Sequence, residues 1–283
     1  MHKFEYHEPK AIADVISLLE TYGDEAKILA GGTDLIVRFR KGSLEPQHII
    51  DIKKIPGTDS VRFSEQGLEI GPAATMYDTE KYCSQFPEYQ VLAQAIHSVA
   101  SCQIRNRATV IGNVCNASPA ADTLPALVVL DAQVRIAGSG GNRVVLLENF
   151  FAGPGKTVLA PGELVTGLLI PPFTAAARGV YLKHSRRRMV DLATVGLAAF
   201  SDSRTVRIAL GAVAPTVIRA KAAELLLAEE GLTHETAAKA ARMVPLSAAP
   251  ITDIRASREY RLEMVAVLAE RALQSLIRGE QPC

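Results

Sequence analysis

The chain has no tryptophan, few aromatic residues and almost no net charge. Aromatic residues make up 5% of its 283 positions, and 31 Lys plus Arg face 30 Asp plus Glu, which leaves a formal net charge of +1. A chain this neutral generates no global field that would attract nucleic acid or an anionic membrane. With so few rings, rows of stacking platforms for single-stranded nucleic acid are not expected either. The composition therefore argues against nucleic-acid binding.

Cysteine is scarce, and neither cysteine nor histidine occurs in a metal-binding spacing. The closest cysteines along the chain, Cys102 and Cys115, are 13 positions apart, and the six histidines form no H-x-H or H-x-x-x-H pair. Zinc sites and redox dithiols need closer spacing. We therefore expect reduced thiols at all four cysteines and no metal site or iron–sulfur cluster in this chain. The cysteines are Cys83, Cys102, Cys115 and Cys283.

Long apolar runs are also missing. None approaches the ~20 residues that span a bilayer, and the opening residues MHKFEYHEPK carry charges where a signal peptide has its apolar stretch. We expect a soluble, cytoplasmic protein.

Hydrophobic residues make up 48% of the chain, and at ~150 residues per domain the length favours about two domains, each with its own core.

Hydrophobic periodicity predicts an α+β fold. Residues 1–60 alternate between helical and strand patterns, whereas the chain beyond Pro171 and Pro172 has a run of strands and then three helices. We place the domain boundary near residue 175, which gives a first domain of residues 1–175, with subdomains of about 1–55 and 56–175, and a second of 176–283. The main predicted helices are 11–22, 35–41, 76–86, 91–101, 124–130, 219–229, 234–242 and 258–278. The predicted strands are 27–30, 48–52, 61–63, 68–70, 134–137, 144–147, 164–170, 180–184, 194–200 and 206–213.

A glycine pair lies between the strand predicted at 27–30 and the helix predicted at 35–41. Gly31 and Gly32 let the backbone approach a ligand closely, and free N–H groups at the start of a helix attract anions. Thr33 adds a hydroxyl donor. The alternative is a tight turn from strand to helix in which Thr33 or Asp34 serves only as the N-cap.

A second segment, CQIRNRATVIGNVCNASPAADT at 102–123, mixes polar turn-forming residues with Val, Ile and Ala. We expect it to form a packed, specifically shaped loop. Its Thr109–Asn113 stretch offers donors for a diphosphate, and the Asp122 carboxylate could accept hydrogen bonds from ribityl or sugar hydroxyls. Together the two segments could clamp one long, anionic ligand. The alternative is a buried network of Asx turns in which Asp122 caps the helix at Leu124.

A basic run, YLKHSRRR at 181–188, is the third candidate. Its commonest meaning is a solvated basic face. Lys183, however, shares the strand phase of Tyr181, and a cation there could favour a negative charge on a nearby ligand. A hydrolase is not indicated, because Ser118 lacks the G-x-S-x-G surroundings of a nucleophile elbow.

Two stretches, LAGGTDLIVRFRKG and IRNRATVIGNVCNASPAADTLPALVVLDA, resemble the two flavin-binding loops of the molybdenum hydroxylase family. The similarity is to the medium, FAD-binding subunit of carbon monoxide dehydrogenase, xanthine dehydrogenase and their relatives. It extends over almost the whole chain, through FEYHEPKAIADVISLL, IGPAATMYD and YLKHSRRRMVDLATVGLAA. One departure is Ile111-Gly112, where relatives commonly have two glycines.

The resemblance implies an FAD-binding region of the vanillyl-alcohol-oxidase (PCMH) type. A C-terminal domain of the carbon monoxide dehydrogenase flavoprotein type would follow, with a small antiparallel sheet and three helices. It also implies that FAD is bound noncovalently, since no His or Cys lies between Ala26 and Lys41 to form a covalent link.

The same resemblance implies which residues contact the cofactor. Residues 29–36 would hold the pyrophosphate, Thr109–Asn113 would form a second clamp, and Asp122 would bind ribityl or ribose hydroxyls. Lys183 would lie near the flavin and favour its anionic reduced form. The implied residues are Leu29, Ala30, Gly31, Gly32, Thr33, Asp34, Leu35, Ile36, Val99, Thr109, Val110, Ile111, Gly112, Asn113, Asp122, Val165 and Lys183.

By this resemblance the chain is an oxidoreductase subunit of a heterotrimer, which assembles as a dimer of heterotrimers. A small partner would carry 2Fe–2S clusters and a large partner the molybdopterin–molybdenum cofactor. FAD would pass electrons to NAD, oxygen or another acceptor. Two alternatives stay open, a stand-alone flavin oxidoreductase and a non-enzymatic nucleotide-binding module. The substrate and the acceptor cannot be read from this chain.

Overall fold

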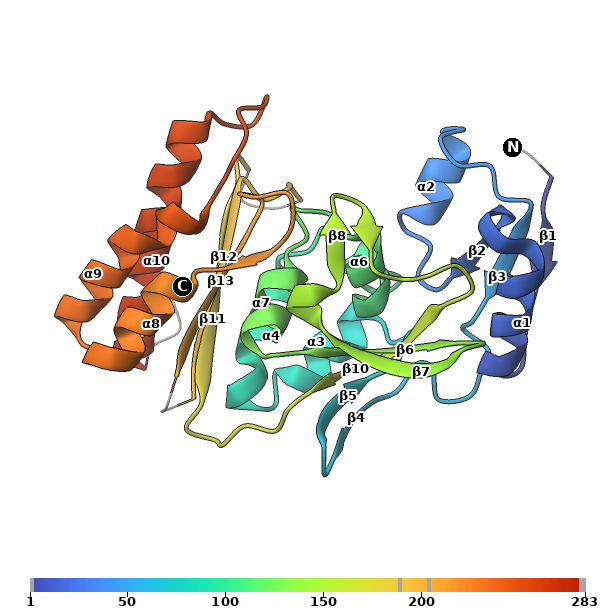
Figure 1. Cartoon of the computed structure of the whole chain (residues 1–283), viewed down its shortest axis with the longest axis horizontal. Coiled ribbons are helices and arrows are strands. Elements are labelled where there is room, and N and C mark those ends of the chain that lie inside the picture. The colour runs from blue at the N-terminus through green and yellow to red at the C-terminus, as the bar shows by residue number, and fades with distance from the viewer. Residues whose placement is uncertain (1–2, 188–189, 203–204, 280–283) are drawn as a thin grey trace.

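The computed structural model describes residues 3–187, 190–202 and 205–279 (Figure 1). Arg188 of the basic run and Cys283 lie outside these residues. Three bodies follow one another along the long axis in Figure 1: an N-terminal body (3–55), a central body (56–175) and a C-terminal body (176–279). No helix in the described ranges is long and apolar enough to cross a membrane.

The N-terminal body contains a three-stranded parallel sheet in the order β1-β3-β2. Helix α1 packs on it because its apolar residues recur at helical spacing, and Val15, Leu19 and Ile50 share one buried cluster. Gly23, at φ +50°, ends the helix. The predicted helices and strands are confirmed here to within about a residue, and β1 is an additional strand. The elements are β1 Glu5–His7, α1 Ile12–Tyr22, η1 Gly23–Glu25, β2 Ala26–Leu29, α2 Leu35–Arg40 and β3 His48–Asp51.

The central body combines a five-stranded antiparallel sheet, in the order β4-β5-β10-β6-β7, with a set of short helices. The strands are β4 Val61–Ser64, β5 Gly67–Ile70, β6 Gln133–Gly138, β7 Gly141–Leu146 and β10 Leu164–Ile170, and β8 Phe151–Gly153 pairs with β9 Lys156–Thr157. The helices are α3 Met76–Cys83, η2 Pro87–Tyr89, α4 Gln90–His97, α5 Cys102–Arg105, α6 Val110–Asn116, α7 Thr123–Val129 and η3 Leu147–Asn149.

The prediction of a loop across residues 102–123 was wrong, because this segment contains α5 and α6. Each helix begins at a hydroxyl N-cap: the Ser101 side chain accepts a hydrogen bond from the Ile104 N–H, and Thr109 accepts one from Gly112. Such caps satisfy N–H groups that a short helix otherwise leaves without partners. Helix α6 ends at Ala117, which has a left-handed φ of +48°. Thr109, one of the polar residues that indicated a loop, is therefore a helix-capping residue.

The C-terminal body has the predicted small antiparallel sheet and three helices. Its central strand β12 is buried on both faces, which explains its continuous apolar sequence. Ala198 and Phe200 pack in the core of the central body, while Leu197 and Ala199 pack under the C-terminal helices. The elements are β11 Arg178–His184, β12 Val195–Ser201, β13 Val206–Gly211, β14 Ile218–Arg219, α8 Lys221–Glu230, α9 His234–Met243, η4 Val244–Ser247 and α10 Arg258–Arg278.

Candidate functional site

A cavity of about 570 Å³ lies where the N-terminal and central bodies meet. Its wall combines the segment between β2 and α2 with α2, α6 and the start of β10. The volume falls within the range of ~300–1,000 Å³ that is usual for sites of small molecules and cofactors. The two segments that the sequence marked as candidates, more than 70 positions apart, therefore line one space.

Gly31 is what allows the two segments to touch. A Cβ atom added at Gly31 would lie 2.2 Å from the Arg107 carbonyl oxygen and 2.9 Å from the Ala108 Cα atom. Only a residue without a side chain permits this approach of two backbones. The next residue, Gly32, has φ +73°, a left-handed conformation that also favours glycine.

The turn after β2 leaves backbone donors free for a ligand. Within the described residues, no acceptor is hydrogen-bonded to the N–H groups of Gly31, Gly32, Thr33 or Asp34. Asp34 occupies the N-cap position of α2 without a side-chain capping bond, so the alternative of a side-chain-capped turn does not describe this segment. Unpaired N–H groups that line a cavity are suited to bind an anion.

The second segment is held in place by Thr109. Its hydroxyl accepts the Gly112 N–H at 3.0 Å, and the neighbouring Ala108 carbonyl accepts the Met76 N–H at 2.8 Å. A Cβ atom at Gly112 would lie 2.7 Å from that hydroxyl, so glycine leaves room for the cap. The Asn113 side-chain oxygen accepts the Thr123 hydroxyl at 2.6 Å. These contacts connect α3, α6 and α7 beside the cavity.

Removing this cap should have a measurable cost. We expect Thr109→Ala to lower the free energy of unfolding by about 1 kcal/mol, because the Gly112 N–H loses its acceptor, whereas Thr109→Ser keeps the hydroxyl and most of the stability. Urea denaturation of the two variants and the parent chain measures the difference. Equal losses in the alanine and serine variants would show that the methyl group, and not the cap, matters.

Asp122 and Lys183 contact each other and do not line the cavity. The Lys183 Nζ atom donates to Asp122 Oδ2 at 2.9 Å and to the Ser98 carbonyl at 3.1 Å, and the Tyr181 hydroxyl donates to Asp122 Oδ1 at 2.7 Å. Ser98 precedes Val99, which does line the cavity. The ammonium group therefore reaches the back of the cavity wall. The Asp122 carboxylate makes no capping bond to α7.

Burial governs the titration of this cluster. Desolvation raises the pKa of Asp122 above its ordinary value of 3.8, while the charge and hydrogen bond of Lys183 and the hydrogen bond from Tyr181 act in the opposite direction. Desolvation and the neighbouring carboxylate raise the pKa of the Tyr181 hydroxyl well above its usual range. The phenol is therefore a stable neutral donor, and the pair of opposite charges is held in a poorly solvated environment.

The cavity brings together most of the residues implied by the sequence, from both bodies. Those in its wall are Ala30, Gly31, Gly32, Thr33, Asp34, Leu35, Val99, Thr109, Ile111, Gly112, Asn113 and Val165. The wall does not include Leu29, Ile36, Val110, Asp122 or Lys183. Val110 is fully buried in the core, and Ile36 is exposed on α2.

Other wall residues were not predicted. Arg38 lies three positions after Leu35 on α2, and this helical spacing was the signal that could have found it. Ile104, Ala108, Cys115 and Asn116 belong to the second candidate segment, 102–123, but were not among the implied contact residues. The remaining wall residues come from segments with no motif: Lys27, Ile28, Leu44, Ile52, Pro72, Met76, Ala100, Leu159, Glu163 and Leu164.

The charged wall residues are Lys27, Arg38, Asp34 and Glu163, and they leave a positive excess because Glu163 is neutralised by a cation from outside the wall. Glu163 is neutralised by Arg143, whose Nε and Nη2 atoms both lie 2.7 Å from its oxygens, and this contact lowers the pKa of Glu163 to about 2. By contrast, no carboxylate in the described part of the chain pairs with Arg38. Burial raises the pKa of the Cys115 thiol to about 12, so this wall residue stays protonated near neutral pH and is a poor nucleophile.

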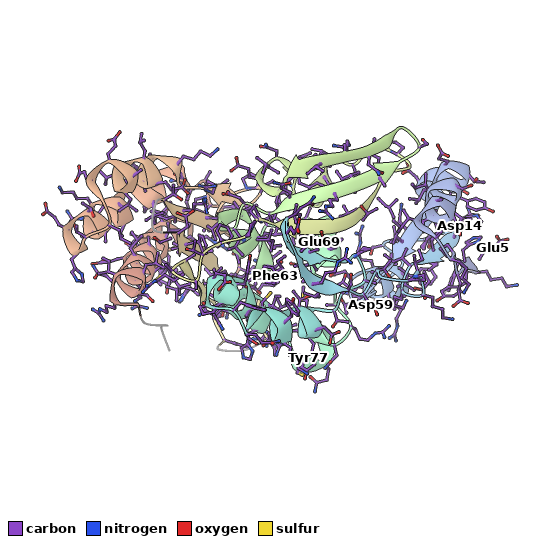
Figure 2. All side chains as sticks on the ribbon, turned by 90° about the horizontal axis from the view of Figure 1, so that it is seen from below. Glu5, Asp14, Asp59, Phe63, Glu69 and Tyr77 are labelled. Atoms are coloured by element: carbon purple, nitrogen blue, oxygen red, sulfur yellow. The ribbon has the colours of Figure 1, made fainter. Side chains whose placement is uncertain are left out.

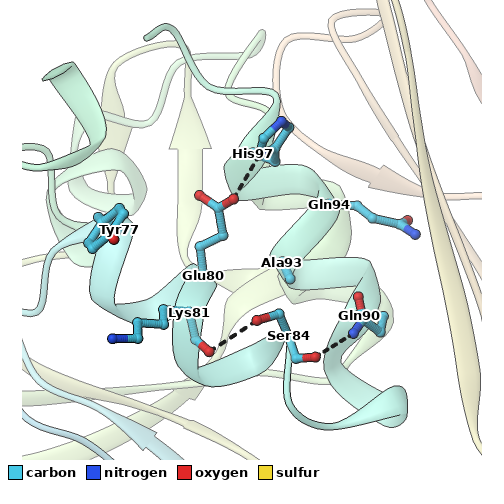
Figure 3. Close-up of a pocket in the computed structure, with 8 residues that line it drawn as sticks. All are labelled: Tyr77, Glu80, Lys81, Ser84, Gln90, Ala93, Gln94 and His97. Atoms are coloured by element: carbon cyan, nitrogen blue, oxygen red, sulfur yellow. Dashed lines mark hydrogen bonds and ion pairs between the residues drawn. The ribbon is translucent and has the colours of Figure 1, made fainter. Parts of the chain in front are cut away.

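A smaller pocket of about 280 Å³ lies on the outside of α3 and α4 (Figure 3). In its wall the Glu80 carboxylate contacts His97 at 2.7 Å and, on the other side, Arg105 at 3.2 Å. Arg105 in turn donates to the carbonyls of His97 and Val99. These contacts fix the end of α4 and the segment that carries Val99 into the main cavity, so we interpret them as structural support.

Comparisons with known proteins agree with this geometry. Residues 2–173 match the family model described as the FAD binding domain in molybdopterin dehydrogenase, and residues 180–276 match the CO dehydrogenase flavoprotein C-terminal domain. The chain is 31% identical to the xanthine dehydrogenase FAD-binding subunit of Escherichia coli O157:H7 over 279 residues, which cover 96% of this chain and 95% of that protein.

Solved structures show the same fold over nearly the whole length. The carbon monoxide dehydrogenase of Hydrogenophaga pseudoflava that lacks the Mo-pyranopterin moiety superposes with a TM-score of 0.91 at 31% identity, covering 98% of both chains. Quinoline 2-oxidoreductase from Pseudomonas putida 86 superposes with a TM-score of 0.90 at 27% identity, covering 99% of this chain and 98% of that one.

These matches confirm the predicted α+β fold with a PCMH-type FAD-binding region, and they confirm the resemblance carried by the two glycine-containing segments. The relatives are dehydrogenase flavoprotein subunits, so the prediction of an oxidoreductase subunit that uses FAD is confirmed as well. The chain belongs to the family of FAD-binding medium subunits of molybdenum hydroxylases.

Proposed function

We propose that this chain holds FAD noncovalently in the 570 Å³ cavity and transfers electrons from an iron–sulfur partner subunit to an acceptor. The observation that carries the proposal is the meeting of the two predicted segments across one cavity, with unpaired N–H groups on the first of them. The protonated Cys115 thiol supports a noncovalent cofactor. Bound flavin supplies the redox chemistry, and the protein supplies position and electrostatics.

We assign the cofactor contacts as follows. The N–H groups of Gly31–Asp34, within the segment Leu29–Ile36, bind the pyrophosphate. Thr109–Asn113 forms the second clamp, and Val99 and Val165 form apolar wall. The implied contact of Asp122 with ribityl or ribose hydroxyls is not kept, because Asp122 is buried outside the cavity wall and its two oxygens accept hydrogen bonds from Tyr181 and Lys183. Lys183 donates to the Ser98 carbonyl beside Val99 and so supports the cavity wall, while its charge is balanced by Asp122 at 2.9 Å.

The names of the relatives, an FAD-binding subunit and a medium chain, support a multi-subunit assembly. We propose a small subunit with 2Fe–2S clusters and a large subunit with the molybdopterin cofactor, assembled as a dimer of heterotrimers in the cytoplasm. NAD, oxygen or another molecule is the acceptor.

Residues 1–175 form the FAD-binding part and 176–283 the C-terminal domain, a division supported by family matches that end at 173 and begin again at 180. The substrate stays open, because the relatives are named for xanthine, carbon monoxide and quinoline.

The positive charge of Arg38 in the cavity wall can be tested for its contribution to FAD binding. We expect Arg38→Ala to weaken FAD binding about tenfold or more, because a charge-assisted hydrogen bond to phosphate is worth about 1.5–3 kcal/mol. Arg40→Ala is the matched control, since Arg40 lies on the same helix, is exposed and is absent from the cavity wall. Titration of the apo-chain with FAD, followed by flavin fluorescence, gives both dissociation constants. Equal affinities in the two variants would remove Arg38 from the proposed site.

The electron-transfer role is tested on the native complex. The chain, carrying an affinity tag, is purified from its own organism, and the copurifying subunits are analysed for molybdenum and iron. We expect both metals in partner polypeptides, and we expect substrate-dependent flavin reduction in the complex but not in the separated chain. Turnover of a substrate by the separated chain would support a stand-alone flavin oxidoreductase instead. Recovery of the chain without any partner would contradict the proposal.

A further inference from the structure

We propose that Glu5, His7 and His48 form a binding site for a divalent first-row transition metal ion on the N-terminal body. These three side chains offer one carboxylate oxygen and two imidazole nitrogens, and all three ligand atoms lie within 4.8 Å of one another. Imidazole suits zinc, nickel, copper and iron, and two histidines with one carboxylate form a common partial coordination shell that leaves positions for water.

Strand register brings the three residues together. In the parallel pair of β1 and β3, Glu5 lies opposite His48. Side chains two positions apart in a strand point to the same face, so His7 shares the face of Glu5. The two histidines are separated by 41 positions in the chain. No local spacing motif could reveal this cluster, and our expectation of no metal site rested on local spacing alone.

The distances fit shared coordination of one ion. The His7 Nε2 and His48 Nδ1 atoms lie 3.1 Å apart. Two nitrogens bound to one tetrahedral zinc at ~2.0–2.1 Å would be about 3.3 Å apart, so the rings need little movement. The Glu5 Oε2 atom lies 3.5 Å from His48 Nδ1 and 3.9 Å from His7 Nε2. The Glu5 side chain is 71% exposed and is free to adjust.

The surroundings hold the imidazoles in place and leave the site open. The Tyr22 ring stacks on His48 with centroids 3.6 Å apart, and its centroid lies 5.5 Å from that of His7. Tyr22 is the last residue of α1, and the carboxyl end of a helix favours a cation. Figure 2 shows Glu5 at the outer end of the N-terminal body, so water can complete the coordination. A metal ion here would fasten β1 to β3.

Without metal, a hydrogen bond joins the two rings, and its proton lies where the ion would bind. A neutral imidazole carries one N–H and can place it on either nitrogen. Metal binding therefore requires each ring to carry its remaining proton on the nitrogen that faces away from the ion. No oxidation or bond cleavage is involved.

The test is isothermal titration of the full, chelator-treated chain with Zn²⁺, with Mg²⁺ as a hard-ion comparison. We expect one equivalent of Zn²⁺ to bind and Mg²⁺ not to compete with it. His48→Gln should weaken Zn²⁺ binding by at least about tenfold, and Glu5→Gln by a smaller factor. His97→Gln is the matched control, because His97 contacts a single carboxylate, Glu80, and should leave the affinity unchanged.

Two further measurements keep the result interpretable. Circular dichroism checks that each variant is folded, and His7→Gln replaces His48→Gln if the loss of stacking on Tyr22 disrupts the body. The visible spectrum of bound Co²⁺ should change in the His7, His48 and Glu5 variants alone. Absence of Zn²⁺ binding to the parent chain would overturn the proposal. So would an equal Zn²⁺ affinity in folded His48→Gln or His7→Gln, because the ion would then be bound elsewhere.

Discussion

Gly31→Ala is expected to abolish FAD binding and to lower the free energy of unfolding by about 1–3 kcal/mol, the usual cost of overpacking. The added Cβ atom would lie 2.2 Å from the Arg107 carbonyl oxygen, and the clash is with backbone, which cannot rotate away. The turn after β2 and the segment that leads into α6 must then separate. Because the cavity exists only where these two segments meet, its anion-binding wall is lost together with their contact.

A matched glycine distinguishes this effect from a general cost of substitution. Gly140 has no heavy atom within 4 Å of an added Cβ and no left-handed φ, so Gly140→Ala should keep the parental FAD content and stability. FAD content after purification and urea denaturation are measured for both variants. A folded Gly31→Ala chain with full flavin occupancy would contradict the assignment of this turn to the cofactor.

Lys183→Met is expected to cost about 3–5 kcal/mol in unfolding free energy at neutral pH. The side chains of Lys183 and Asp122 are only 12% and 8% exposed, and removal of the lysine leaves a buried carboxylate without its counter-ion. The Tyr181 hydrogen bond remains but carries no charge. The double variant Lys183→Met, Asp122→Asn should recover much of this loss. A double-mutant cycle by urea denaturation measures the recovery.

The same variant should show a distinctive dependence on pH. Loss of Lys183 removes two influences that lower the pKa of Asp122, while desolvation continues to raise it. The folded-state pKa then lies further above the unfolded value near 3.8, and the folded variant takes up its proton first as the pH falls. Its stability deficit relative to the parent is therefore largest above the folded-state pKa and shrinks as the pH falls through it. A deficit that stays constant as the pH falls from neutral to the unfolded-state pKa of 3.8 would contradict this expectation.

The sequence predicted the regular elements well where local pattern and tertiary environment agree. The predicted helix 258–278 matches α10, and the predicted strand 164–170 matches β10. In both segments the spacing of the apolar residues is enough to indicate the type of element. The prediction failed at 102–123, because a hydroxyl residue such as Thr109 is common both in loops and at the N-cap of a helix. The choice was decided by burial of Val110 and Val114 in the core, which no local pattern reveals.

The sequence predicted those residues of the candidate site that belong to a motif or to the family resemblance. Gly31 and Gly112 could be found from the sequence, but the reason for Gly31, contact with the Arg107 backbone, depends on the fold. The contact between Asp122 and Lys183, residues 61 positions apart, likewise needed the packing of β11 against the central body. The pairing of His7 with His48 required the register of two parallel strands. Long-range contacts of this kind have no signature in local spacing.

The central claim, that the cavity holds FAD without a covalent bond, is tested most directly by releasing the cofactor. The purified chain is denatured, the protein is removed by filtration, and the flavin in the filtrate is identified by chromatography and quantified against the chain. We expect about one FAD per chain, all of it in the filtrate. A colourless chain that takes up no added FAD, or a flavin that stays attached to the denatured protein, would contradict it.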